Sequence, residues 1–144
     1  MFVKGQSMSL AELLFLYVAF RVKQVVCDFF LQPSWMALVK GQPEKGGTRA
    51  LVMHAGIHAI FTFALMLVFA PKLWWLGIVD FLVHAIIDKS KAMLNHKTGW
   101  TYKDNAYWWA FGIDQEAHNL THLVYIVIIV LHSGASLHSG MPLH

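Results

Sequence analysis

The sequence predicts an all-α membrane protein, a single domain over residues 1–144 in which four transmembrane helices form a bundle. Hydrophobic residues make up 57% of the chain and charged residues only 13%, and the mean hydropathy is positive. A soluble domain usually contains about 25% charged residues. Four segments of the chain also approach the roughly 20 apolar residues that a membrane helix needs.

The predicted spans run over residues 10–31, 50–70, 73–94 and 106–131. Ser9 and Glu12 match a capping box at the start of the first span. A turn at Pro71 separates the second and third spans, and polar or Gly-rich loops follow the first and third. Lys23 interrupts the first span, so either its ammonium group reaches an interface or the helix turns a polar face inward. Residues 132–144 are predicted to form a flexible tail.

Basic residues near the ends of the spans predict the orientation of the bundle. The two polar loops and the adjoining helix ends contain Lys40, Lys45, Arg49, Lys89, Lys91, Lys97 and Lys103, whereas the opposite side has only Lys4 and Lys72. We therefore expect both loops in the cytoplasm and both termini outside. The net charge is only +3 and no basic patch is formed, so the sequence does not favour nucleic-acid binding.

Each predicted span carries polar residues four positions apart. The four sets are Gln24, Asp28 and Gln32; His54 and His58; Asp80, His84 and Asp88; and Asp114, His118 and His122. Four helical residues turn about 400°, so the members of each set share one helix face. In lipid these faces must turn towards one another, because a charge exposed to acyl chains is costly. The sets also overlap in depth, in the cytoplasmic half of the bundle.

This combination of imidazoles and carboxylates suggests a site for a divalent metal, with zinc favoured and iron or manganese as alternatives. Two HxxxH pairs would each let one helix offer two ligands. The expected ligands are His54, His58, His84, Asp88, Asp114 and His118, with Asp28 next. Asp114 or Asp28 is the expected general base, while Asp80, His122 and Lys91 are expected to support the ligands. Lys91 lies about one turn past Asp88, where it could neutralise a carboxylate or meet an anionic headgroup. The alternative interpretation is a metal-free network of Asp–His and Arg21–Asp pairs.

Glu12, Glu116 and four other histidines are not assigned to this site. Glu12 is expected to be a cap, and Glu116 lies off the polar face of Asp114 and His118. His96 is expected in a loop, and His132, His138 and His144 in the solvated terminus.

Four segments of the sequence together resemble a known family. DFFLQPSWMALVK, HAGIHA, HAIIDKSK and DQEAHNLTH are similar to motifs of an uncharacterised bacterial integral-membrane family, domain of unknown function 3307. The resemblance implies a small protein of the bacterial inner membrane. It also implies that Gln32 and Gln115 belong to the site, together with Asp28, His54, His58, His84, Asp88, Lys91, Asp114 and His118. The family brings no established activity.

The sequence leaves three classes of function open. The first is a metal-dependent hydrolase acting on a lipid-like substrate that enters from the membrane. The second is a non-enzymatic accessory subunit that handles a metal or protons, in a larger membrane complex or a homo-oligomer. The third is a non-haem iron oxidase, and a haem held by His58 and His118 is a related alternative.

Overall fold

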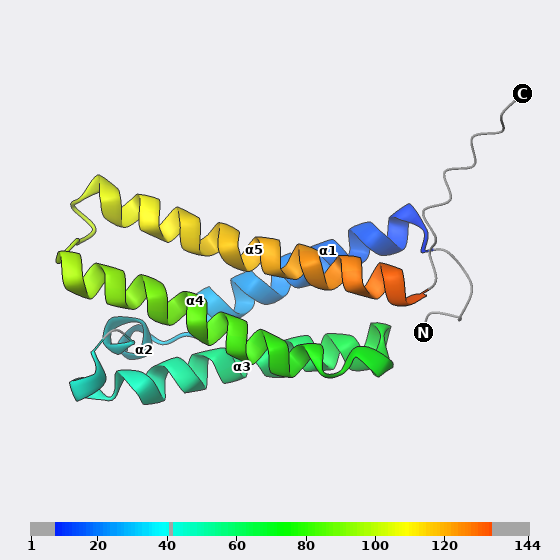
Figure 1. Ribbon diagram of the computed structural model, residues 1–144, viewed down its shortest axis with the longest axis horizontal. Coiled ribbons are helices and arrows are strands. Elements are labelled where there is room, and N and C mark those ends of the chain that lie inside the picture. Colours follow the sequence, from blue (N-terminus) through cyan, green and yellow to red (C-terminus); the bar gives the residue numbers. More distant parts are fainter. Residues whose placement is uncertain (1–7, 41, 134–144) are drawn as a thin grey trace, which may run out of the picture.

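The computed structural model describes residues 8–40 and 42–133, and these form an all-helical bundle (Figure 1). Its four long helices are α1 (Leu10–Val25), α3 (Gly47–Phe69), α4 (Leu76–Thr98) and α5 (Asn105–Ser133). A π-helical turn, η1 (Val26–Phe30), continues α1, and a short helix α2 (Ser34–Val39) follows it. Two 3₁₀ turns, η2 (Pro43–Lys45) and η3 (Pro71–Leu73), precede α3 and α4.

The helix boundaries agree with the predicted spans to within a few residues, and the differences have local causes. Helix α1 begins at the predicted capping box, in which the Glu12 backbone N–H donates to Ser9 Oγ and the Ser9 N–H donates to Glu12 Oε2. Helix α4 extends to Thr98 and ends where Gly99 adopts a φ of 69°, a conformation that favours glycine. The prediction that His96 lies in a loop is therefore wrong, because hydrogen bonding continues through the polar residues as far as Gly99.

The predicted tail also begins too early. Residues 132 and 133 are the last two residues of α5, with His132 exposed on the helix. Residues 134–144, including His138 and His144, lie outside the described part of the chain, as does Lys4.

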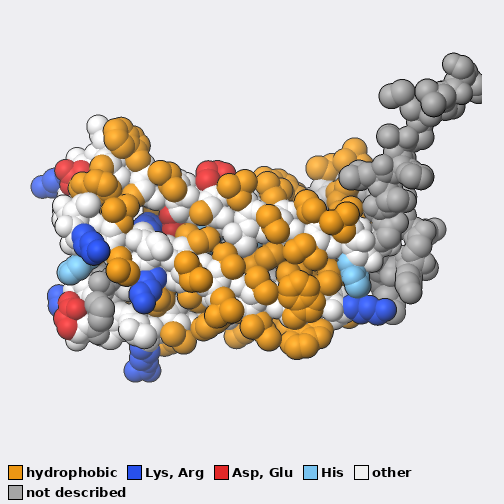
Figure 2. Space-filling model, in the orientation of Figure 1, with side chains coloured by type: hydrophobic (Ala, Val, Ile, Leu, Met, Phe, Trp, Pro, Cys, Tyr) orange, Lys and Arg blue, Asp and Glu red, His pale blue; other side chains and the backbone are white. Residues whose placement is uncertain are grey.

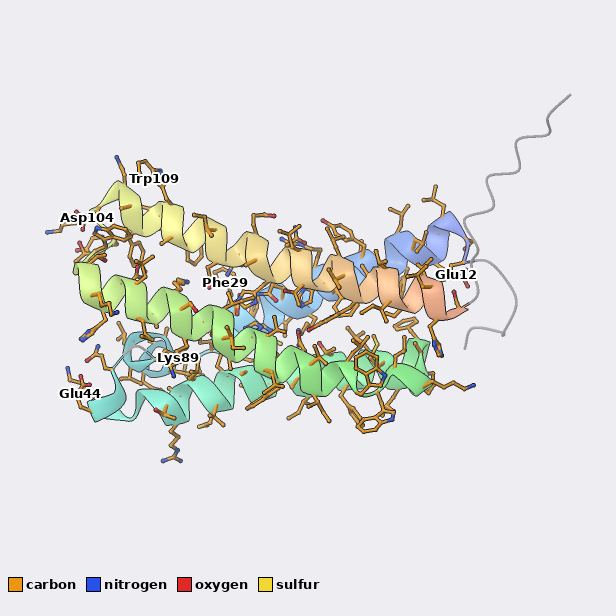
Figure 3. The ribbon with its side chains drawn as sticks, in the orientation of Figure 1. Glu12, Phe29, Glu44, Lys89, Asp104 and Trp109 are labelled. Atoms are coloured by element: carbon orange, nitrogen blue, oxygen red, sulfur yellow. The ribbon has the colours of Figure 1, made fainter. Side chains whose placement is uncertain are left out.

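The long helices enclose two different interiors. Near the ends of the bundle formed by Leu10, Ser133 and η3, a core of apolar side chains includes Leu16, Phe20, Met66, Leu76 and Ile129. Farther towards α2 and the α4–α5 connection, the buried polar side chains are mostly histidine and aspartate. Figure 3 shows that Glu44 and Asp104 lie at this second end, opposite Glu12.

The outer surface of the bundle is largely apolar. Figure 2 shows hydrophobic side chains over the long sides, whereas most of the visible charged side chains lie towards the end of the bundle formed by α2 and the α4–α5 connection. By length and composition, one described helix, α3, could cross a membrane, and one third of its apolar 18-residue window is buried. A single helix of this kind also occurs in the cores of soluble proteins, so the fold establishes a helical bundle with one candidate span.

Gly77 allows α4 to pack closely against α3. A Cβ added at this position would lie 2.9 Å from Phe63 Cβ and 3.2 Å from the Ala59 carbonyl oxygen. A Cβ at Gly56, in the middle of α3, would meet nothing within 4 Å. The two glycines therefore make a matched pair for testing the packing.

We predict that Gly77→Ala destabilises the protein by about 1–3 kcal/mol, because the added methyl group overpacks the α3–α4 contact. Gly56→Ala should leave the stability unchanged or raise it by up to about 1 kcal/mol, since alanine is the better helix former. Thermal unfolding of both variants under the same conditions, followed by tryptophan fluorescence, measures the difference. Equal unfolding temperatures would contradict the close packing at Gly77.

Candidate metal centre

All four long segments contribute to a group of six buried or half-buried side chains, which we call the His–Asp cluster. The group comprises Asp28 from η1, His54 and His58 from α3, His84 and Asp88 from α4, and His118 from α5. Five of the six are buried, and Asp28 is partly exposed. The polar faces predicted from the four-residue spacing thus meet inside the bundle.

The four imidazoles pack directly against one another, with His84 at the centre. The ring centroids of His58 and His84 lie 3.6 Å apart, and those of His84 and His118 lie 3.9 Å apart. His54 meets the edges of His58 and His84 at 4.7 and 5.3 Å between centroids. Such contact places the ring nitrogens of three helices within a few ångströms.

Several of these nitrogens are buried without a hydrogen-bond partner. Both ring nitrogens of His84 and the Nδ1 atoms of His54 and His58 have none among the described residues. His84 is only 1% exposed, so water does not replace the missing partner at the surface. Because buried polar groups in proteins are nearly always satisfied, these nitrogens are the feature of the cluster that a bound ion could explain.

The ligand atoms fall into two sets, each with its atoms within 4.8 Å of one another. One set consists of Asp28, His54, His58 and His84, and the other of His84, Asp88 and His118. Three or four His and Asp ligands are the number that zinc takes from a protein. The donor set therefore fits a divalent ion, although the identity of the ligands stays a prediction.

Asp28 is oriented by neighbouring amides. Its Oδ2 accepts hydrogen bonds from Nε2 of Gln24 at 2.8 Å and from Nε2 of Gln115 at 3.1 Å. Its Oδ1 faces the histidines, 3.2 Å from Nε2 of His54 and 3.1 Å from Nε2 of His58. Asp28 lies in the π-helical turn η1, a conformation that is found frequently at functional sites.

Asp88 is paired with Lys40, a residue that the sequence analysis did not assign to the site. Lys40 Nζ lies 2.8 Å from Asp88 Oδ2, while His54 and His118 lie 3.4 and 3.6 Å from the same carboxylate. The Gln32 amide, in the orientation that satisfies both of its polar atoms, accepts from Lys40 Nζ at 2.7 Å. Lys40 follows α2 and belongs to none of the four-residue sets, so the spacing of polar residues did not identify it. The sequence assigns it a role only among the basic residues that predict the orientation.

Asp114, an expected ligand, lies at the edge of the cluster. Its Oδ2 pairs with Lys91 Nζ at 2.9 Å, and its buried Oδ1 is 3.8 Å from His118 Nε2 and has no hydrogen-bond partner among the described residues. It belongs to neither set of ligand atoms. Asp114 therefore lies beside the two sets of ligand atoms. Lys91 neutralises the Asp114 carboxylate, one of the two roles that the sequence suggested for this lysine.

A second polar layer lies deeper, next to the apolar core. Lys23 Nζ contacts Asp80 Oδ2 at 2.7 Å and His122 Nε2 at 3.2 Å, and Thr62 Oγ1 donates to the same Asp80 oxygen at 2.7 Å. Lys23 is only 3% exposed, which shows that α1 turns this polar face inward. Among the described residues the buried partner of Asp80 is Lys23, and no Arg21–Asp pair is formed.

The cluster adjoins a small polar cavity of about 80 Å³. Its walls include the carboxylates of Asp28, Asp88 and Asp114 and the ammonium groups of Lys40 and Lys91. The cavity therefore gives the cluster a polar entrance lined by charges of both signs.

Glu116 lies outside the cluster, as the sequence predicts. It is exposed and accepts a hydrogen bond from the Asn119 amide.

The comparisons with known proteins give one result. A family model described as a protein of unknown function, DUF3307, matches residues 16–142, a range that contains the whole His–Asp cluster and the Lys23–Asp80 layer. No curated protein and no solved structure matches the chain. The chain belongs to the DUF3307 family.

Proposed function

We propose that this chain is a multi-pass membrane protein that binds a divalent metal in the His–Asp cluster and uses it to hydrolyse a lipid-like substrate. The observation that carries the proposal is His84, which is buried among three imidazoles and two carboxylates with both ring nitrogens unsatisfied. A bound metal ion would satisfy this arrangement of donors. Zinc is the favoured ion, with iron or manganese as alternatives.

Membrane integration is supported by a distribution of apolar and polar side chains that is the inverse of that in a soluble protein. Large apolar residues point outward on every long helix, as Phe15, Ile60, Ile86 and Leu120 do with exposures of 60%, 67%, 63% and 59%. Lys23 and the aspartates and histidines of the four-residue sets lie inside instead. Helices α3 and α4 have 23 residues each, a length of about 35 Å at 1.5 Å per residue, which exceeds a hydrocarbon core of about 30 Å. We propose that α1, α3, α4 and α5 all cross the bilayer.

The orientation follows from the basic side chains. Lysines and Arg49 lie around α2 and the α4–α5 connection, where the cluster opens into its polar cavity. Under the positive-inside rule this end faces the cytoplasm. Exposed aromatic residues occur at both ends, Trp74 and Trp75 near η3 and Trp108 and Trp109 near the start of α5, as expected of membrane interfaces. The inner membrane of a bacterium is the proposed location.

The proposed reaction is hydrolysis of an ester, amide or phosphoester. When bound, a divalent ion would lower the pKa of a coordinated water to about 7 and polarise the scissile carbonyl or phosphoryl group. Asp114 is the better placed general base, because its Oδ1 is free of hydrogen bonds whereas Asp28 Oδ1 faces two imidazoles. Lys40 and Lys91 hold Asp88 and Asp114 in place and supply positive charge at the cavity.

A second candidate function is a proton-handling or accessory subunit of a larger membrane complex. The Lys23–Asp80–His122 layer favours it, because it continues the chain of titratable groups beyond the cluster into the bundle. Such acid–histidine ladders resemble the proton relays of membrane pumps. Co-purification of a stable partner whose proton transport depends on Lys23 would support this function over hydrolysis. The third candidate, an iron oxidase, would show a visible absorption band in the purified protein.

We predict that His58→Ala reduces bound metal to background and abolishes turnover, because His58 contributes one of the four atoms in the larger ligand set. His96→Ala is the matched control, since His96 is an exposed histidine on α4 away from the cluster. Elemental analysis of protein purified without added metal measures the metal in each variant. An absorption spectrum of the same samples distinguishes zinc from iron.

Metal retained at the wild-type level in His58→Ala, or lacking in the wild-type protein, would contradict the metal site. Circular dichroism and the unfolding temperature of both variants show whether loss of metal reflects loss of the fold.

We further predict that single cysteines at opposite ends of α3 and α4 react from opposite sides of the membrane. After Cys27→Ala removes the buried native thiol, Lys45→Cys and Lys103→Cys should react with an impermeant maleimide only from the cytoplasmic side, and Lys72→Cys only from outside. These exposed positions flank α3 and α4. Labelling of all three from one side would show that neither helix crosses the bilayer.

A further inference from the structure

We infer that the groove between α4 and α5 receives one hydrocarbon chain of an anionic amphiphile, and that Lys91 binds its phosphate headgroup. The inference rests on the proposed function and names the substrate class of that site. Four observations carry it: the groove, its apolar lining, its connection to the metal centre, and the charges at that connection.

The groove is an apolar depression of about 310 Å³ on the side of the bundle. It is lined by Ile86 and Leu94 from α4 and by Ala110, Ile113 and Ala117 from α5. Ile86 and Ile113 are 63% and 71% exposed, so the groove opens sideways onto the surface that the proposed membrane would cover. This volume is near the lower limit of ligand pockets, about 300 Å³, which suits a single chain.

The groove leads to the metal centre. Lys91 and Asp114 line both the groove and the polar cavity, so their ion pair separates an apolar space from a polar one. On the other side of this pair lie Asp28 and Asp88 of the His–Asp cluster. A molecule that places its chain in the groove therefore places its headgroup at the Lys91–Asp114 pair, next to the cluster.

Three aspartates and two lysines line the polar cavity, and Lys91 is the cation that also lines the groove, where the headgroup would lie. Lys91 Nζ lies 2.9 Å from Asp114 Oδ2 and 4.7 Å from the centre of the Phe111 ring, and its side chain is 23% exposed. The Asp114 side chain is only 3% exposed, so Lys91 is the more accessible member of the pair. A phosphate that takes hydrogen bonds from Lys91, with Lys40 across the same cavity, would release Asp114 from its partner and leave that carboxylate free to act as a base.

A photoreactive alkyl phosphate tests the groove directly. The full-length protein is reconstituted in phosphatidylcholine vesicles with a dodecyl phosphate that carries a diazirine near the end of its chain, and labelled peptides are identified by mass spectrometry. We expect saturable labelling of the α4 and α5 residues that line the groove. An excess of unlabelled dodecyl phosphate should suppress it by about tenfold, as expected when the competitor is at about ten times its own Kd, whereas inorganic phosphate or dodecyltrimethylammonium should not.

Two matched pairs of variants test the chain and the headgroup separately. Ala117→Leu fills the groove and should abolish the saturable labelling, while Ala64→Leu, on an exposed face of α3, should not. Lys91→Met should remove the preference for phosphate over ammonium, while Lys89→Met should keep it, because Lys89 lies exposed two residues away on the same helix (Figure 3).

Three outcomes would overturn the inference. They are labelling that does not saturate, displacement by inorganic phosphate alone, and equal labelling of Ala117→Leu and Ala64→Leu. Metal analysis of the same samples separates this result from that of the proposed function. Bound metal without groove labelling refutes the substrate class alone, and groove labelling without metal refutes the metal site alone.

Discussion

The structure depends on the burial of polar side chains inside a bundle whose outer surface is apolar. Histidines and aspartates on one helix have only the polar faces of the other helices as partners, because the outward-facing residues around them are Phe, Ile, Leu and Val. This constraint fixes the rotation of each long helix about its own axis. It also explains why a fully buried lysine, Lys23, is tolerated, since Asp80 and His122 meet it at the same level.

The four-residue spacing made much of this arrangement predictable from the sequence. His54 and His58, or His84 and Asp88, must share a face on any straight helix, and lipid or packing then turns that face inward. The apolar segments of the sequence located the four long helices, although among the described helices only α3 is long and apolar enough to be a candidate span. Local signals such as the Ser9–Glu12 capping box located helix ends. These predictions use only the periodicity of a single helix, which is why they agree with the structure.

The contacts that depend on the relative placement of segments were not predictable in the same way. Lys40 reaches Asp88 from a short helix inside a predicted loop, and no repeat connects the two residues. The sequence ranked Asp114 above Asp28 as a ligand, but the π-helical turn brings Asp28 to His54 and His58, while Lys91 draws Asp114 to the edge. Small differences in the rotation of each helix decide which carboxylate reaches the histidines. The spacing of residues in the sequence contains no information about these differences.

The balance of charge distinguishes Asp28 from the other aspartates in the interior of the bundle. Three of the four aspartates in the interior are each paired with a lysine: Asp80 with Lys23, Asp88 with Lys40 and Asp114 with Lys91, at 2.7 to 2.9 Å. Asp28 has no lysine or arginine partner among the described residues and meets only amides and imidazoles. It therefore retains negative charge in the same ligand set as His84, whose two ring nitrogens are unsatisfied. A cation among Asp28, His54, His58 and His84 would supply both the missing charge and the missing partners, whereas the second ligand set already has a lysine on its carboxylate.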